Sequence, residues 1–150
     1  MVAGETDPRD VRSIAVTADD VVTAYEADRR SARSPVLRVT PPFSGRMRAR
    51  LHVADSESRR TSDVDEETGA VHVSPTRLVD ETRIPDYPTP DDTEDAIRSN
   101  PDESFSVEHH HERQVEAVAD WRATVADALV ESVELRTVDG PHRVEVKRLG

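Results

Sequence analysis

A group of arginines without neighbouring carboxylates is the part of this sequence best suited to do chemistry. Residues 29–54 contain seven arginines and no aspartate or glutamate, although the chain of 150 residues carries a formal net charge of −11. Arginine presents a planar fork of N–H donors that binds phosphate or carboxylate in a bidentate manner. This window therefore predicts a binding site for an anionic partner, which is either a nucleic acid or an acidic protein surface.

Strand periodicity predicts how these arginines are positioned. From Arg46 to Val53 polar and apolar residues alternate, which is typical of a β-strand with one buried face. Outward side chains on such a strand stand about 7 Å apart, comparable with the phosphates of a nucleic-acid strand. The inward positions are expected to be Met47, Ala49, Leu51 and Val53. The predicted partner-binding residues are Arg38, Phe43, Arg46, Arg48, Arg50 and His52, with Phe43 expected to stack on a base.

Two other interpretations explain the same arginines without an external ligand. Residues 55–112 carry 17 acidic and 5 basic residues, so this segment could cover the arginines as a counter-charge within one chain or between subunits. The protein would then be a regulatory or structural interaction domain that exposes its arginines when a partner displaces the segment. Alternatively, the arginines form a solvated strand face.

A run of three histidines, His109 to His111, is the second candidate for chemistry. On a helix, His109, Glu112 and Glu116 lie near one face, where they could ligate the divalent ion of a metal-dependent enzyme. However, adjacent histidines point about 100° apart, and neither His-x-x-x-His nor His-Glu-x-x-His occurs. The run is more typical of a polar first turn, so no metal or cofactor is predicted. His52 and His72 are expected at outward strand positions.

The remaining sequence offers no motif for catalysis or for crossing a membrane. The chain has no cysteine, which excludes thiolate nucleophiles and disulfides. It contains no nucleophile elbow, phosphate-binding glycine loop or dinucleotide fingerprint. No stretch approaches the roughly 18 apolar residues of a membrane span, and residues 1–12 lack the pattern of a secretory signal. We therefore expect a non-enzymatic cytoplasmic protein that does not bind membranes.

The composition favours a salt-rich environment. The chain has 31 acidic and 20 basic residues, of which 19 are arginine, and its apolar residues are mainly valine and alanine. Acidity keeps a protein hydrated once salt screens its self-repulsion, and small apolar side chains limit the burial that concentrated salt strengthens. The run from Val36 to Val53, with the segment Thr17–Arg33 before it, resembles small uncharacterised proteins of halophilic archaea. This resemblance implies no activity, cofactor or site residue.

The elements that hold these residues follow from caps, periodicity and turns. Helices are predicted over 18–31, 89–98 and 107–132, and strands over 36–40, 46–53, 71–73, 133–138 and 142–149. The long helix is expected to bury Val115, Val118, Trp121, Val125, Ala128 and Leu129.

These elements predict a single α+β domain over residues 1–150. We expect two layers, in which an antiparallel sheet of four to five strands is covered on one face by two helices. Residues 55–69 and 80–105 are rich in carboxylates, Ser, Thr and Pro, so they are expected to form a long, acidic, partly disordered insertion.

Overall fold

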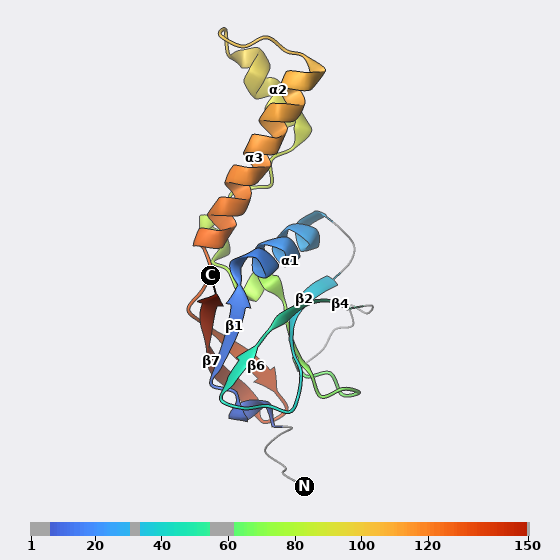
Figure 1. Ribbon diagram of the computed structural model, residues 1–150, viewed down its shortest axis with the longest axis vertical. Coiled ribbons are helices and arrows are strands. Elements are labelled where there is room, and N and C mark those ends of the chain that lie inside the picture. Colours follow the sequence, from blue (N-terminus) through green and yellow to red (C-terminus); the bar gives the residue numbers. More distant parts are fainter. Residues whose placement is uncertain (1–6, 31–33, 55–61, 150) are drawn as a thin grey trace. The chain divides into compact units, whose positions relative to one another are not determined.

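The computed structural model describes residues 7–30, 34–54 and 62–149, and these confirm the predicted α+β class (Figure 1). The chain forms two compact units, one of Met1–Asp80 with Leu129–Gly150 and the other of Glu81–Ala128. The elements of the first unit are η2 (Pro8–Asp10), β1 (Ser13–Thr17), α1 (Ala18–Arg30), β2 (Ser34–Val39), β3 (Arg46–Arg48), β4 (Arg50–Ala54), β5 (Val71–Val73), η3 (Pro75–Arg77), β6 (Ser132–Thr137) and β7 (Gly140–Leu149). Those of the second unit are η4 (Glu81–Arg83), α2 (Pro90–Ser99) and α3 (Val107–Asp127).

Two sheets build the first unit, with strand orders β3-β1-β7-β6 and β4-β2-β5. β1 runs parallel to β3 and β7, whereas β6 and β7 form the predicted antiparallel hairpin. In the second sheet, β2 is antiparallel to β4 and β5. The expectation of one antiparallel sheet is therefore wrong. The physical reason is β1, a central strand that the sequence did not predict. Because α1 follows β1 directly, the chain crosses over before β3 joins the sheet, and such crossover connections place strands parallel to each other.

The strand predicted over 46–53 changes its pairing partner in the middle. β3 pairs with β1, whereas β4 pairs with β2. Between them, the N–H of the buried Ala49 donates to the carbonyl of Ala15 at 2.9 Å. The predicted hairpin with residues 36–40 is thus formed by β4 alone. Leu51 and Val53 were expected in the core but are 38% and 43% exposed, because β4 is the last strand of its sheet.

A short segment, residues 62–64, joins the remaining edges of the two sheets. The N–H of Asp63 donates to the carbonyl of Arg136 at 2.7 Å, and the carbonyl of Asp63 accepts from the N–H of His72 at 2.8 Å. Val64 makes a bridge to Val71 beside it. Backbone pairing therefore runs in a closed circuit through β6, β7, β1, the β3–β4 strand, β2, β5 and residues 62–64, which leaves few edge groups unpaired.

Alternating residues of these strands and one face of α1 form the core of the first unit. The strand contributions are Ile14, Val16, Leu37, Val39, Val71, Val73, Val133, Leu135, Val144 and Val146, and those of α1 are Val21, Val22, Ala24 and Tyr25. The start of α1 is fixed as predicted, because the Oγ1 atom of Thr17 accepts a hydrogen bond from the N–H of Asp20 at 3.1 Å.

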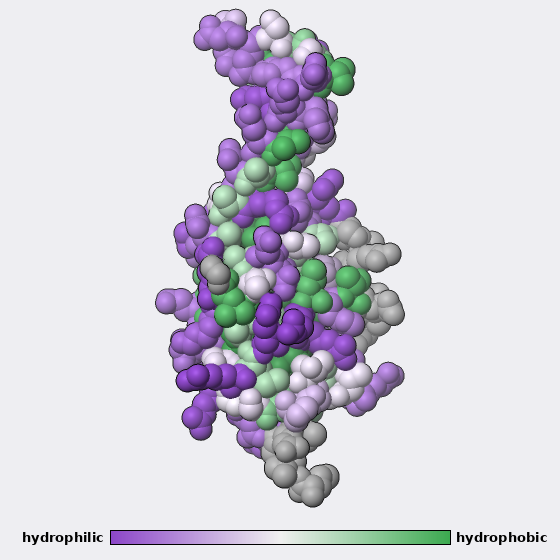
Figure 2. Space-filling model, in the orientation of Figure 1, coloured by the Kyte–Doolittle hydropathy of each residue, from purple (hydrophilic) through white to green (hydrophobic). Residues whose placement is uncertain are grey.

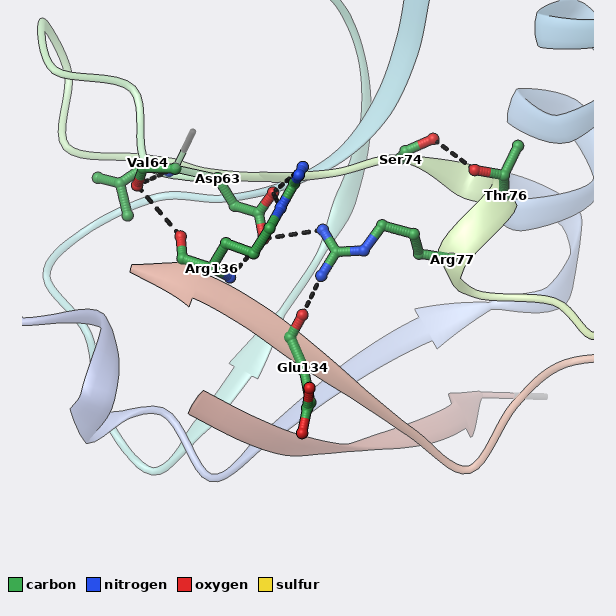
Figure 3. Close-up of polar contacts among 8 residues, drawn as sticks. Asp63, Val64, Ser74, Thr76, Arg77, Glu134 and Arg136 are labelled. Carbon is green, nitrogen blue, oxygen red and sulfur yellow. Dashed lines mark hydrogen bonds and ion pairs between the residues drawn. The ribbon is translucent and has the colours of Figure 1, made fainter. Parts of the chain in front are cut away.

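The carboxylate of Asp63 is the buried anchor of residues 62–64 (Figure 3). Asp63 is 4% exposed and is the one charged residue among the buried residues of the described chain. Its Oδ2 atom accepts from Nη1 of Arg77 at 2.8 Å and from the backbone N–H of Arg136 at 2.6 Å, and its Oδ1 atom accepts from Nη2 of Arg136 at 3.0 Å. Arg77 also donates to the carbonyl of Glu134. The expected flexible segment is therefore not confirmed for residues 62–69, and residues 55–61 lie outside the described part.

The second unit is a helical hairpin in which residues 85–89 are fastened to both helices. The Oγ1 atom of Thr89 accepts from the N–H of Asp92 at 3.1 Å, so Thr89 is the N-cap of α2. The indole N–H of Trp121 donates to the carbonyl of Pro85 at 2.9 Å. The ring of Tyr87 packs edge-on against the same indole, with 4.9 Å between the ring centroids. The expected flexible segment over 80–105 is therefore not confirmed, because aromatic packing and a helix cap hold residues 85–92 in place.

Helix α3 packs on α2 within the second unit. Its N-cap is Ser106, since the Ser106 hydroxyl accepts from the N–H of His109 at 3.0 Å. Trp121 and Val125 of the predicted stripe are buried, whereas Val115 is 54% exposed. Because α3 belongs to the second unit, the predicted two-layer arrangement with two helices on one sheet face is not confirmed. No helix in the described part of the chain is long and apolar enough to cross a membrane.

The chain enters and leaves the second unit at two neighbouring points of the first unit. Val79 and Leu129 form an isolated antiparallel bridge. Beside it, the N–H of Val130 donates to the carbonyl of Leu78 at 3.0 Å. Residues 81–128 are therefore inserted between two paired segments.

Replacing Asp63 with Asn should destabilise the first unit, because both guanidinium groups would lose their buried counter-charge. Breaking a buried ion pair typically costs about 3–5 kcal/mol, and the partial exposure of Arg136 reduces this to roughly 2–4 kcal/mol. Urea unfolding followed by far-UV circular dichroism measures the change. The exposed Glu66→Gln is the matched control and should cost almost nothing. A loss for D63N no larger than that for E66Q would contradict this role.

Candidate functional site

The sheet β4-β2-β5 brings a row of basic side chains together on one face. Arg38 on β2 lies directly opposite Arg50 on β4 and, on its other side, directly opposite His72 on β5. Opposed residues of antiparallel strands project from the same face. The row therefore crosses three strands, and together with His52 it forms what we call the Arg–His face (Arg38, Arg50, His52 and His72).

The two imidazoles of this face meet above the central strand. His52 on β4 lies opposite Val36, whereas His72 lies on β5, so β2 separates the two strands that carry them. Their ring centroids are 5.5 Å apart and the ring planes differ by 29°, which is a stacked arrangement. The sequence indicated His72 only as an outward strand residue between two valines. Its place beside Arg38 depends on strand register, which the sequence did not reveal.

The two arginines of the Arg–His face have no counter-charge among the residues that the structure describes. Like charges directly opposite each other destabilise a pair of strands. Among the residues that the structure describes, no ion pair joins Arg38 or Arg50 to a carboxylate. The Nε atom of Arg38 is buried and lacks a hydrogen-bond acceptor there, and leaving such a donor unsatisfied costs about 1–3 kcal/mol. The face thus carries a local cost that an anionic ligand would offset.

Arg46 and Arg48 lie on β3 and are exposed, but they do not extend this row. They stand opposite Ser13 and Ala15 of β1, because the strand changes its partner at Ala49. The prediction of a single row of arginines is therefore wrong, because Arg46 and Arg48 belong to one sheet and Arg50 belongs to the other. In the described part of the chain, neither Arg46 nor Arg48 makes an ion pair with a carboxylate.

Phe43 is removed from the predicted binding residues. It lies between β2 and β3 and is only 6% exposed. Its ring is part of the core, so it cannot stack on a nucleic-acid base from this position. The sequence shows an aromatic residue beside turn residues, and such a pattern does not indicate whether the ring points outward or inward.

The histidine run on α3 makes local hydrogen bonds. His109 Nε2 lies 2.9 Å from Oε2 of Glu103, and His110 Nε2 donates to the carbonyl of Pro90 at 2.8 Å. Glu112 and Glu116 are exposed. No group of three or more His, Cys, Asp or Glu side chains in the described ranges is arranged to hold a metal ion. These histidines instead fasten the first turn of α3 to the loop before it and to α2.

The second unit also contains a pocket of about 270 Å³ between α2 and α3. Its lining residues are Pro88, Asp92, Thr93, Ala96, Arg113, Glu116, Ala117 and Asp120. The Nε atom of Arg113 lies 3.5 Å from Oε2 of Glu103, so Arg113 already forms an ion pair with a carboxylate. Three carboxylates and one arginine are the charged groups of the lining, so the pocket carries negative charge and does not suit the anionic partner expected for the Arg–His face.

The fold and this site define an α+β protein whose most distinctive surface is a cationic face on a three-stranded sheet. The chain belongs to the family described as a domain of unknown function (DUF8009), which matches residues 1–150. The expected resemblance to an uncharacterised family is confirmed by this match. No curated protein and no solved structure matches the chain.

The ion pair of Glu103 predicts a pH-dependent contribution to the stability of the second unit. The hydrogen bond from His109 lowers the pKa of Glu103 below its ordinary value of 4.5, with Arg113 and Asn100 acting in the same direction and desolvation opposing them. Because the folded-state pKa is the lower one, ionised Glu103 stabilises the fold above its ordinary pKa. This contribution is lost as the pH falls through the lowered pKa.

Urea unfolding followed by the fluorescence of Trp121, the single tryptophan of the chain, measures this effect. At neutral pH, Glu103→Gln should be less stable than the parent chain, and the difference should vanish in acid. Glu112→Gln removes an exposed carboxylate of α3 in the same unit and serves as the control. A stability difference for E103Q that stays constant from neutral to acidic pH would rule out the assigned role of Glu103.

Proposed function

We propose that this chain is a non-enzymatic binding module that takes an anionic partner on the Arg–His face. The observation that carries the proposal is the direct opposition of Arg38 and Arg50 on neighbouring strands, without a carboxylate partner in the described chain. Two guanidinium groups side by side offer paired donors for phosphate or carboxylate oxygens. An anion bound between them would remove their mutual repulsion.

A nucleic acid is the partner class that the geometry favours. Guanidinium and imidazole groups are planar, so they can stack on unpaired bases as well as donate to phosphates. The stacked pair of His52 and His72 beside Arg38 provides such planar groups on one face of the sheet β4-β2-β5. Stacking matters at high salt in particular, because the contribution of phosphate contacts to affinity falls steeply as salt rises. An acidic protein surface would use the donors of the face but would offer no bases on which the rings could stack.

Intramolecular masking of this face by the acidic segment is the alternative, and the described contacts favour it less. Asp63, the one buried carboxylate, is held by Arg77 and Arg136. No described carboxylate forms an ion pair with the arginines of the face. A deletion of residues 56–103 would also remove β5 and Asp63, so masking is better tested by charge substitutions. Asp55→Asn with Glu57→Gln should leave ligand affinity unchanged unless these carboxylates compete for the face.

We further propose that the protein works in a salt-rich cytoplasm. Residues 81–128 contain 13 acidic and 4 basic side chains, and the surface of α2 and α3 is mostly hydrophilic (Figure 2). Along α3, Glu108, Glu112, Glu116 and Asp120 follow one another at intervals of four residues and are all exposed. Like charges at this spacing destabilise a helix until salt screens them. This pattern and the resemblance to proteins of halophilic archaea support the proposal.

Binding should depend on the arginines of the face. A fluorescein-labelled single-stranded oligothymidylate is titrated with the protein, and fluorescence anisotropy gives Kd. The double variant Arg38→Ser, Arg50→Ser should weaken binding by about tenfold or more, because two bidentate contacts are lost. The control is Arg143→Ser, an exposed arginine that lies opposite Glu134 in a strand of the first unit. It should change Kd by less than about twofold.

Three outcomes separate the possible partners. Loss of oligothymidylate binding in R38S/R50S but not in R143S supports a nucleic-acid partner. If poly-glutamate binds the parent chain and oligothymidylate does not, the partner is an acidic protein surface. If neither probe binds the folded parent chain, the proposed function is wrong.

The proposed environment predicts that added salt stabilises the chain. Thermal melts followed by circular dichroism should show Tm rising from low salt to molar KCl, since salt screens the repulsion among the carboxylates of residues 81–128. Replacing Glu112 and Glu116 with Gln should reduce this rise, because two like-charge contacts of α3 are removed. A Tm that falls as KCl is added would contradict a salt-rich working environment.

A further inference from the structure

We propose that the free edge of β4 binds an extended segment of a partner protein in which acidic residues alternate with apolar ones. The segment joins the sheet β4-β2-β5 as an added antiparallel strand. This inference goes beyond the proposed function, because it assigns a second surface that is built from backbone groups. It starts from the direction in which the N–H and C=O groups of β4 point.

Strand register shows which backbone groups of β4 are paired. The N–H of His72 donates to the carbonyl of Asp63, so His72 directs its backbone groups away from β2. Arg38, directly opposite His72, therefore directs its own groups towards β4 and exchanges hydrogen bonds with Arg50. Backbone groups of successive residues in a strand point in opposite directions. The next residue, Leu51, thus directs its N–H and C=O away from β2.

A contact with β1 gives the same direction. The N–H of Ala49 donates to the carbonyl of Ala15 on β1, and Leu51 and Val53 alternate in phase with Ala49. β1 ends at Thr17, where the chain turns into α1. Among the residues that the structure describes, none forms a hydrogen bond with this side of Leu51 or Val53. The edge of β4 therefore offers two N–H donors and two carbonyl acceptors.

The side chains along this edge are of two kinds. Arg50 and His52 project from the Arg–His face, whereas Leu51 and Val53 project from the opposite face, which also carries the buried Leu37. Although they lie on the core side of the sheet, Leu51 and Val53 are partly exposed. Unpaired backbone groups beside uncovered apolar side chains are the features to which a further strand is added.

Charge determines which segment fits this edge. An added strand places one residue directly opposite Arg50 and another opposite His52. A carboxylate opposite Arg50 supplies the counter-charge that Arg50 and the adjacent Arg38 lack among the described residues. The neutral imidazole of His52 offers an N–H donor to the second carboxylate. Apolar residues opposite Leu51 and Val53 cover their exposed surface.

A second copy of this chain fits the edge less well. β4 has the sequence Arg-Leu-His-Val-Ala and contains no acidic residue. Two copies paired along β4 would bring a second arginine and a second histidine to the same face without a counter-charge. The charge of the edge therefore favours a partner whose strand carries carboxylates.

The test is a fluorescence anisotropy titration of the folded full-length chain with the fluorescein-labelled peptide Val-Glu-Val-Glu-Val. One derivative carries N-methyl groups on its valines and another carries them on its glutamates. In the added strand, the backbone groups of the valines face Leu51 and Val53, whereas those of the glutamates face away. Methylation of the valines should raise Kd by about tenfold or more, because hydrogen bonds to β4 are lost. Methylation of the glutamates should change Kd by less than about threefold.

The contribution of charge is measured with the same assay. Replacing both glutamates of the peptide with glutamine should raise Kd by about two- to fivefold, as expected for exposed ion pairs. Molar KCl should remove this difference, because salt screens the charges. The glutamine peptide should still bind in molar KCl, since its backbone hydrogen bonds and apolar contacts remain.

Variants of the chain locate the bound peptide. Leu51→Pro removes an N–H that faces the free edge and keeps the hydrogen bonds between β2 and β4, so it should raise Kd by about tenfold. The matched control is Val138→Pro, which replaces another exposed apolar residue, between β6 and β7. It should leave Kd unchanged. Circular dichroism shows whether each variant is folded, and the methylated peptides test the parent chain without any substitution.

The outcomes separate this inference from the proposed function. If methylated valines weaken binding no more than methylated glutamates, or if L51P behaves as V138P, the inference is wrong. If the chain alone forms dimers in analytical ultracentrifugation and L51P abolishes them, the edge binds a second copy and the assigned partner is wrong. The proposed function is judged by oligothymidylate binding, which can fail while the peptide binds or succeed while it does not.

Discussion

One buried carboxylate holds the first unit together. The two sheets would each expose unpaired backbone groups at an edge, and residues 62–64 pair with both edges. Asp63 makes this possible because its side chain binds Arg77 and Arg136, whose charges would otherwise lie unpaired beside the closure. The sheet β4-β2-β5 is one side of this closed circuit. The arrangement of the Arg–His face on that sheet therefore depends on a buried ion pair between Asp63, Arg77 and Arg136, which lie outside the face.

The net negative charge and the arginines of the Arg–His face lie in different units of the chain. Nearly all of the excess acidity belongs to residues 81–128, which form the helical hairpin. The first unit uses its one buried carboxylate for closure. Among the residues that the structure describes, this acidic protein keeps Arg38 and Arg50 on one sheet without a carboxylate partner, and a net charge of −11 does not by itself exclude an anionic partner.

The sequence predicted those features that depend on neighbouring residues. The caps Thr17, Thr89 and Ser106 and the hairpin β6–β7 follow from residues within a few positions of one another. It did not predict β1, although Ile14 and Val16 alternate there, because a parallel strand has no adjacent turn to mark it. The sequence also did not predict that Arg38 lies directly opposite Arg50. An alternating pattern assigns residues to the faces of a strand but does not give the register between two strands. Asp63 looked like one more acidic residue because its partners lie 14 and 73 positions away.

The bridge between Val79 and Leu129 makes the hairpin of α2 and α3 an insertion between two paired backbone segments. The chain leaves and rejoins the first unit at adjacent backbone positions that are already paired. An insertion at such a point changes neither the order of the strands nor the closure of their circuit. Over evolutionary time the hairpin is therefore free to lengthen, shorten or be exchanged for another segment. The acidity of the protein can be adjusted to its surroundings through this insertion, while the sheet that carries the arginines stays the same.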